Sequence, residues 1–497
     1  MGKEFVLGLD IGTSSGKVCI LDIEGRFLGI DGEAYPTRVL RPAWAEQDPG
    51  LWLPALGRAC RRLIGRLGLT GADARGLAIT SAAHVGVLLD AGRMPVRPSL
   101  LWHDQRSQPQ SHRLAETAGD EIFALGNNWP TATWTLPHLL WIRENDPEAW
   151  EKSRYLLLSK DYLAYQLTGR MTSDPAAAVS ALLWDAERNA WSPRLCELAG
   201  LTSDSLPEVL PIGAEIGALL PEAADILGLT TAVRVFNGTM DSTAETFSAG
   251  VRAEGECVIR LASAGGIHGI SHPPRVHPKL ISYPYPVAPY WLAQAGTNTC
   301  ASAVAWACST LGDGEPDFAA WTRLAESSSA GAGGLLFHPY LAGERCPYWD
   351  SDLRASFVGL SLHHGRADIA RAVYEGTAYA LRDGLGVLED RGFVLRQVRL
   401  VGGGTKSALW CQIVSAVLDC PVQAAPQADS SAGGCLFALA GLGRYGSLAE
   451  IPADLLTGES APRLGPDPML RDVYRDGFAE YRRIQRHLAA IYHGESA

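Results

Sequence analysis

The sequence predicts an α/β fold divided into two related domains, and three observations support this prediction. The chain has 497 residues, whereas a single hydrophobic core stops growing near ~250–300 residues. Runs typical of strands and of helices alternate up to about residue 229, as in layered α/β proteins. A strand-turn-strand pattern at residues 5–22 is echoed at residues 256–270. We therefore expect one domain at residues 1–229 and a second at residues 230–497.

Local patterns predict the elements in chain order. The pattern at residues 5–22 comprises an apolar run, a cluster of Gly, Thr and Ser, and a second apolar run. A helix is expected at about 49–67, because Asp48 can cap it, Pro49 suits its first position, and Leu residues recur at helical spacing. The later expected elements are a strand-turn-strand at 256–270, a surface loop at 328–334, a helix at 366–389, a strand at 397–401 and a helix at about 473–492.

Composition excludes several classes of protein. Hydrophobic residues make up 47% of the chain and charged residues 20%, which argues against a disordered or low-complexity protein. The net charge of -11 gives no general attraction for nucleic acid or an anionic membrane. Ten scattered cysteines without a CxxC pair indicate reduced thiols in a cytosol. We expect no signal peptide and no membrane span, and hence a cytoplasmic protein.

The first turn carries residue types that bind phosphate. Glycines let backbone N–H groups approach phosphate oxygens, hydroxyls add donors and a lysine adds a point charge. Asp10, at the strand end, can hold Mg²⁺ through water, since Mg²⁺ prefers carboxylates together with substrate phosphates. The spacing is not that of a Walker A loop, and an ordinary tight hairpin is the alternative. The candidate phosphate-binding residues are Gly12, Thr13, Ser14, Ser15 and Lys17.

A second glycine-rich segment follows the strand expected at 397–401. Gly402, Gly403 and Gly404 precede Lys406 and a run with helical spacing. Backbone N–H groups at a helix N-terminus form an anion or nucleotide site, and glycines leave no side chain in its way. A flexible loop between strand and helix is the alternative.

Asp241 is the candidate general base. It lies in a turn of small residues, 237–243, after an apolar strand. An Asp in such a turn can accept a proton from a substrate hydroxyl, as in phosphoryl transfer. The alternative is an Asp that caps its own backbone, the commoner case in turns.

Two segments offer groups that suit a sugar. Trp102, His103 and Asp104 lie in a run with an amide and a guanidinium, and aromatic faces with such polar groups bind sugar hydroxyls. A surface turn held by a salt bridge is an equal alternative. His84 ends an apolar strand, where a lone His is more often a core residue than a ligand.

Together, these segments resemble the FGGY carbohydrate kinase family, most closely its xylulokinase branch. The resemblance runs from about Phe5 to about Gly443. The segments that carry it, in chain order, are 10–17, 44–49 (Trp-Ala-Glu-Gln-Asp-Pro), 102–106, 160–163 (Lys-Asp-Tyr-Leu), 339–345 (Pro-Tyr-Leu-Ala-Gly-Glu-Arg), 375–381 and 402–410.

The resemblance implies two actin-like (ribonuclease H-like) ATPase domains around a central cleft, with MgATP mainly on the second domain and the sugar mainly on the first. It implies phosphorylation of a sugar hydroxyl, with D-xylulose to D-xylulose 5-phosphate as the first expectation and another ketopentose, a polyol or an aldonate as the alternative. Asp241 matches the family's base, while His84 and Asp104 match sugar-contacting positions. A homodimer is a further expectation from the family.

The sequence departs from the family pattern at several positions. Ala82-Ala83-His84-Val85 stands for QMHG, so Ala83 becomes a candidate sugar neighbour. Ser263, in Ala262-Ser263-Ala264, stands in the second phosphate loop, which usually reads GTS. The remaining departures are His103 for Asn, His138 for Lys, and bulkier residues around Asp241.

These departures leave a second function as an alternative, namely a nucleotide-dependent sugar sensor that does not turn over its substrates. A chaperone-like or cytoskeletal ATPase is a third option, but the retained sugar-side segments argue against it.

Overall fold

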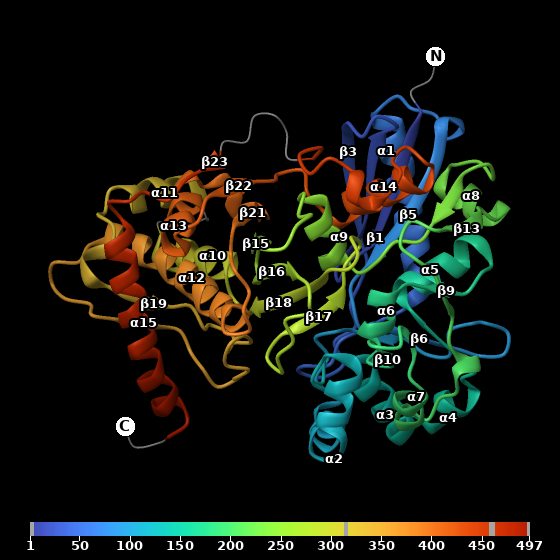
Figure 1. Ribbon diagram of the computed structural model, residues 1–497, viewed down its shortest axis with the longest axis horizontal. Coiled ribbons are helices and arrows are strands. Elements are labelled where there is room, and N and C mark those ends of the chain that lie inside the picture. Colours follow the sequence, from blue (N-terminus) through green and yellow to red (C-terminus); the bar gives the residue numbers. More distant parts are fainter. Residues whose placement is uncertain (1–3, 313–316, 457–462, 495–497) are drawn as a thin grey trace. The chain divides into compact units, whose positions relative to one another are not determined.

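The protein, described here by a computed structural model, folds into two compact units, shown in Figure 1 for residues 4–312, 317–456 and 463–494. Unit 1 comprises the described residues of Met1–Gly250, Tyr283–Tyr290 and Gln427–Leu456, and unit 2 those of Val251–Ser282, Trp291–Pro426 and Thr457–Ala497. The expected boundary between residues 229 and 230 therefore falls inside unit 1. Residues 230–250 belong to unit 1 together with the residues before them, and two later segments return to the same unit.

Unit 1 is built on a six-stranded sheet with the order β13-β14-β5-β1-β2-β3. β1 pairs antiparallel with β2 and β2 antiparallel with β3, whereas β1 is parallel to β5 and β5 parallel to β14. The edge strand β13 is antiparallel to β14. The strands are β1 (Phe5–Ile11), β2 (Ser15–Asp22), β3 (Phe27–Ala34), β5 (Ala74–Ser81), β13 (Glu215–Ala218) and β14 (Arg234–Phe236).

Unit 2 repeats this arrangement. Its sheet has the order β17-β18-β16-β15-β21-β22-β23. β18 pairs antiparallel with β16 and β16 antiparallel with β15, whereas β15 is parallel to β21 and β21 parallel to β22. The edge strand β23 is antiparallel to β22, so the series of pairings from β18 to β23 is the same as that from β3 to β13 in unit 1. The strands are β15 (Glu256–Leu261), β16 (Gly265–Ser271), β17 (Ile281–Pro284), β18 (Trp291–Thr297), β21 (Gln397–Val401), β22 (Val422–Ala424) and β23 (Arg463–Leu464). The echo between residues 5–22 and 256–270 thus reflects a repeated topology.

Helices and short strand pairs complete each unit (Figure 1). In unit 1 the helices are α1 (Trp52–Arg66), α2 (Gln108–Gly126), α3 (Thr135–Asn145), α4 (Pro147–Lys152), α5 (Ser159–Thr168), α6 (Pro175–Ser180), α7 (Pro193–Ala199), α8 (Pro221–Leu227), α9 (Asp241–Ser248) and α14 (Ser430–Gly441). In unit 2 they are α10 (Ala301–Leu311), α11 (Phe318–Glu326), α12 (Arg366–Glu389), α13 (Ala408–Leu418) and α15 (Arg471–Tyr492). The short strands are β4 (Glu46–Gln47), β6 (Gly86–Leu89), β7 (Ser99–Leu100), β8 (Tyr155–Leu158), β9 (Thr172–Ser173), β10 (Trp184–Asp185), β11 (Ala190–Trp191), β12 (Glu208–Val209), β19 (Leu336–His338) and β20 (Ser356–Val358).

The elements predicted from local pattern are largely confirmed. Asp48 caps a short 3₁₀ turn at Pro49–Leu51 by accepting from the Gly50 N–H, and α1 follows directly. The predicted 366–389 helix and 397–401 strand coincide with α12 and β21. Each unit also has its own hydrophobic core, as the two-domain prediction requires.

Two further expectations concern cysteines and membranes. All ten cysteines are free and buried, so none forms a disulfide. Within the described ranges, no helix combines the length and the apolar character needed to cross a membrane.

Candidate active site

The predicted phosphate loop is a tight hairpin between β1 and β2 in unit 1. Gly12 N–H donates to Ser15 O at 3.1 Å and closes the turn. Two side chains hold the loop from outside: Tyr35 OH donates to Gly12 O at 2.5 Å, and Gln47 Nε2 donates to Thr13 O at 2.7 Å. Ser14 at the tip is exposed, and Gly12, Thr13 and Ser15 are half-buried. The loop therefore has an exposed tip on a backbone that these three hydrogen bonds hold in place.

Lys17 and Asp10 face each other across the β1–β2 ladder. The Lys17 ammonium lies 2.9 Å from Asp429 Oδ2, and Thr80 Oγ1 donates to Asp10 Oδ1 at 2.8 Å. Burial raises the pKa of Asp10, with Lys17 opposing and Asp429 reinforcing the shift. Burial also opposes the charge of Lys17, but Asp429 and Asp10 outweigh it and raise the lysine pKa.

Asp429 contacts the candidate site through Lys17, and sequence reasoning missed it. It caps α14 by accepting from the Ser431 N–H at 2.9 Å. An Asp before Ser-Ser-Ala-Gly-Gly could have been recognised as a helix cap. Its pairing with Lys17 could not, because 412 residues separate the two in sequence.

The donor set around Lys17 fits a magnesium ion. Asp10 and Asp429 bring two carboxylates to one ammonium, and both influence the same Lys17. Mg²⁺ prefers oxygen ligands, typically one or two carboxylates with substrate phosphates. Asp10 is buried at the end of β1, and its contact with Mg²⁺ through water stays a prediction.

Trp102 links the candidate sugar-side segment to the predicted phosphate loop. Its Nε1–H donates to Thr13 Oγ1 at 3.0 Å, which brings together two segments that the sequence separates by 89 residues. The neighbouring His103 is exposed, and partial burial of its ring lowers its pKa.

Asp104 is used to hold its own loop. Its carboxylate is fully buried and accepts from the Ala45 N–H at 2.6 Å and from Arg106 Nε at 3.0 Å. Arg106 also pairs with Glu46 of the Trp-Ala-Glu-Gln-Asp-Pro segment at 3.1 Å. The salt-bridged turn considered as the alternative therefore exists, in a buried form. The sugar-binding role of Asp104 is supported by the resemblance alone.

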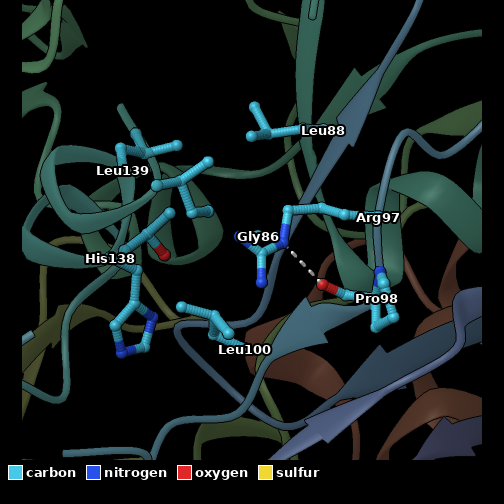
Figure 2. A pocket seen from close by; sticks show the side chains of 9 residues that line it. Gly86, Leu88, Arg97, Pro98, Leu100, His138 and Leu139 are labelled. Carbon is cyan, nitrogen blue, oxygen red and sulfur yellow. Dashed lines mark hydrogen bonds between the residues drawn. The ribbon is translucent and has the colours of Figure 1, made fainter. Parts of the chain in front are cut away.

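A small pocket of unit 1 lies next to this loop (Figure 2). Arg97 reaches into it, and its Nε–H donates to Pro98 O at 3.2 Å. His138 is buried, and burial lowers its pKa to about 4, although the nearby Asp104 opposes this shift. The lining residues are Gly86, Leu88, Arg97, Pro98, Leu100, Thr135, His138, Leu139 and Ile142. None of the predicted site residues lines this pocket, but Thr135 Oγ1 donates to His84 O at 2.9 Å, so the pocket borders the candidate site.

His84 is held on both ring nitrogens. Nδ1 lies 3.0 Å from Ser180 O, a group that can only accept, so Nδ1 carries the proton. Nε2 must then accept, and Tyr283 OH lies 2.8 Å from it. Burial lowers the His84 pKa to about 3, so the ring is neutral. Ala83, beside it, is half-buried.

Tyr283 is a second residue that sequence reasoning missed. It lies in the Tyr283–Tyr290 segment that returns to unit 1. Its ring is buried, with Trp134 at 6.4 Å between ring centroids. Burial and the negative charge of Asp241 both raise its pKa, so Asp241 acts on the same part of unit 1.

Asp241 is the first residue of α9 and is half-buried. Its Oδ1 accepts from the Ser242 N–H at 2.6 Å. A carboxylate in the first turn of a helix is stabilised as the anion by the helix dipole. An anionic Asp241 is the form that can accept a proton.

The nucleotide candidates lie in unit 2. Ser263 is exposed in the β15–β16 turn, and its carbonyl accepts from the Cys300 N–H at 2.9 Å. A Cβ at Gly402, where φ is +91°, would meet Leu261 O at 2.7 Å, so the glycine turn lies beside the end of β15. Exposed Lys406 ends that turn.

The expected order of strand, glycine turn and helix is confirmed. A 3₁₀ turn at Gly403–Lys406 lies between β21 and α13, and α13 begins at Ala408 with Ser407 as its cap. Gly404 is required by packing, because a Cβ there would lie 2.5 Å from the Trp410 ring.

The repeated topology and the family matches define the protein as a two-domain carbohydrate kinase. The chain belongs to the FGGY family of carbohydrate kinases: the family's N-terminal domain matches residues 5–248 and its C-terminal domain residues 264–441. The actin-like fold and the kinase class expected from the sequence are thereby confirmed.

Individual relatives are similar over nearly the whole chain. The xylulose kinase of Escherichia coli (strain K12) is 30% identical over 494 residues, covering 98% of this chain and 99% of that protein. The gluconokinase of Bacillus subtilis (strain 168) is 25% identical over 462 residues, covering 90% and 89%. The crystal structure of xylulose kinase from Rhodospirillum rubrum matches with a TM-score of 0.89 and 27% identity, covering 99% of this chain and 100% of that one.

Proposed function

We propose that this protein phosphorylates D-xylulose with ATP to give D-xylulose 5-phosphate. The observation that carries the proposal is the Trp102–Thr13 hydrogen bond, which joins the sugar-side segment to the phosphate loop within unit 1. The near-full-length similarity to proteins named xylulose kinase supports the choice of sugar.

In the proposed mechanism Asp241 accepts the proton of a terminal sugar hydroxyl. That oxygen attacks the γ-phosphorus in line, while the bond from this phosphorus to the β-phosphate oxygen breaks and ADP leaves. Lys17, Thr13 and the backbone N–H groups of residues 12–15 stabilise the charge on the transferred phosphate. Bound Mg²⁺ would neutralise phosphate charge, with Asp10 holding it through water and Asp429 fixing Lys17 beside it.

In unit 2, the resemblance assigns the nucleotide to two neighbouring segments. Ser263 would offer its hydroxyl to a phosphate. The Gly402–Gly404 turn would leave room for the ribose and α-phosphate, with Lys406 adding positive charge.

A different sugar is the second candidate, and one observation favours it. Beside the sugar, Ala82 and Ala83 replace an amide and a thioether, and both nitrogens of His84 are already bonded. A pocket altered in this way suits another ketopentose, a polyol or an aldonate. The similarity to a gluconokinase is consistent with an aldonate.

ADP release measured across a sugar panel tests the proposal. D-xylulose, D-ribulose, xylitol and D-gluconate would each be supplied with MgATP, and ³¹P NMR would identify the product. The proposal expects the highest kcat/KM for D-xylulose. A higher value for another sugar would reassign the substrate. Binding of sugar and ATP without sugar-dependent ADP release would instead indicate a sensor.

Two further aspects belong to the same proposal. We place the enzyme in the cytoplasm, where ATP is available and ten free thiols stay reduced. A homodimer is the assembly that the resemblance favours, and light scattering in solution would check it.

A further inference from the structure

Unit 1 contains a lysine that is almost completely withdrawn from solvent. Lys160, in α5, is 1% exposed. Its ammonium lies 2.8 Å from Asp161 Oδ1 and 3.3 Å from Asp174 Oδ1, and it donates to Asn237 Oδ1 at 3.0 Å. Burial opposes its charge, but Asp161 and Asp174 outweigh this effect and raise its pKa. Lys160 therefore stays protonated in the core of the unit.

Two partners of Lys160, Asn237 and Asp174, make further hydrogen bonds. Asn237 Nδ2 donates to Ser173 O and to Leu210 O, both at 2.9 Å. Thr239 Oγ1 donates to Asp174 Oδ2 at 2.8 Å. Asn237 and Thr239 are both fully buried. Lys160 thus contacts Asn237 directly and is linked to Thr239 through Asp174, and these are the two polar side chains of the 237–240 segment.

The backbone of the same segment is also constrained. A Cβ at Gly238 would lie 1.8 Å from Ile79 O, so the segment lies directly against β5. Met240 forms a parallel bridge with Ser81 at the end of that strand. Only Met240 separates Thr239 from Asp241, the first residue of α9. A displacement of this segment would therefore move the Asp241 carboxylate.

Stability alone does not explain a buried charge of this kind. Taking an ammonium and two carboxylates out of water costs free energy, and well-packed apolar residues often serve stability equally well. What such a network does provide is a fixed geometry, because removing any member leaves a buried polar group unpaired. A misplacement of about 1 Å can cost about 100-fold in rate.

We propose that Lys160 is a positioning residue for the proposed base: through Asn237, and through Asp174 with Thr239, it fixes the segment that places Asp241. This inference rests on the proposed function, because it takes Asp241 as the base. The Lys-Asp-Tyr-Leu segment that the sequence suggested for the sugar side would thereby act on the base.

The first test replaces Lys160 by Met, which keeps most of the volume and removes the charge. We expect kcat to fall by about 10- to 100-fold because the base is misplaced, while KM for sugar and for ATP changes less than about threefold, since neither is bound by this network. The acidic limb of the kcat–pH profile should move as well. Amide hydrogen exchange of residues 238–242 should accelerate, and this readout needs no substrate.

Two further variants separate positioning from general destabilisation. Thr239→Val removes a single hydrogen bond of the network and should cause a smaller loss of kcat in the same direction. Arg371→Met is the matched control in unit 2, where a buried guanidinium bonds Glu375 at 2.9 Å and Tyr474 at 2.8 Å. It should lower thermal stability and leave kcat and the pH profile unchanged.

Several results would overturn the inference. These are a folded Lys160→Met protein with wild-type kcat, a loss confined to KM, or an equal loss of kcat in Arg371→Met. If Lys160→Met does not fold, Thr239→Val becomes the deciding variant. A wild-type kcat in Thr239→Val would then refute the positioning role of Lys160. If the wild-type enzyme phosphorylates no sugar, the proposed function fails separately. The amide hydrogen exchange of residues 238–242 then tests the inference by itself. If the exchange rates in the variants equal those of the wild type, Lys160 does not fix this segment.

Discussion

His84 has no free ring nitrogen, and this changes its role in the proposed reaction. Ser180 O fixes the proton on Nδ1, and Tyr283 OH donates to Nε2. With its pKa lowered to about 3, the ring stays neutral and can act neither as a base nor as a cation near neutral pH. Contact with a sugar hydroxyl then requires Tyr283 to move or to make the contact itself.

This arrangement predicts a specific NMR signature. From about pH 5 to about pH 8, the ¹⁵N signals of His84 should remain those of a neutral ring protonated at Nδ1. In Tyr283→Phe the Nε2 acceptor loses its donor, which should lower the free energy of unfolding by about 1–3 kcal/mol. Partly exposed Tyr445→Phe serves as the control. Titration of His84 near its ordinary pKa would contradict the assignment.

The sequence allows candidate site residues in local motifs, such as Thr13, Lys17 and Trp102, to be proposed, because their chemistry and spacing can be read directly. It could not predict partners that only folding brings together. Tyr283 is 199 residues from His84, and Asp429 is 412 residues from Lys17. The same limitation hid the buried state of Asp104.

At the scale of elements, α14 connects several parts of the proposed site. Its cap Asp429 binds Lys17 at 2.9 Å, and its glycines allow close contact with neighbouring backbone. A Cβ at Gly434 would lie 3.0 Å from Gly8 Cα of β1, and one at Gly433 would lie 2.4 Å from Ala244 O of α9. α14 therefore positions both the lysine of the phosphate loop and the helix that begins at Asp241.

Gly433→Ala should test this role. The added methyl group must push α14 away from α9, and such overpacking typically costs about 1–3 kcal/mol. We expect a lower thermal midpoint and a lower kcat. Gly386→Ala in α12 is the matched control: a Cβ there meets nothing within 4 Å, so the change should stabilise by about 1 kcal/mol through helix propensity. Equal midpoints for the two variants would contradict the close packing.

At the scale of the whole molecule, the two sheets share the same series of parallel and antiparallel strand pairings. In the sequence this repeat is visible only as the similar strand-turn-strand patterns at residues 5–22 and 256–270. The hairpins were predictable because apolar runs flank small residues. The extent of unit 1 was not, because Tyr283–Tyr290 and Gln427–Leu456 return to it through contacts distant in sequence. Family domain bounds of 5–248 and 264–441 likewise place residues 230–248 in the N-terminal domain.

The stability of the molecule should depend on pH through Glu344 in unit 2. This carboxylate is buried, and burial raises its pKa from 4.5 to about 7 despite hydrogen bonds from Thr297 Oγ1 and from the N–H groups of Asn298 and Arg345. Between these two values, folded Glu344 holds a proton that the unfolded chain has released. The free energy of unfolding should therefore fall by about 3 kcal/mol as the pH rises through this window.

Glu344→Gln mimics the protonated side chain and should remove this part of the pH dependence. Thermal unfolding of both proteins between about pH 5 and about pH 8 measures the difference, because other titrating groups affect both alike. Parallel curves for wild type and variant would show that Glu344 does not titrate in this range.

The central claim is that Asp241 accepts the proton of a sugar hydroxyl. Its most direct measurement is kcat for sugar-dependent ADP release by Asp241→Asn, with Asp225→Asn, whose side chain is 91% exposed, as the control. Loss of a general base predicts a fall of at least ~100-fold in kcat, with KM for the sugar little changed and the control active. A kcat for Asp241→Asn close to that of the wild type would contradict the account.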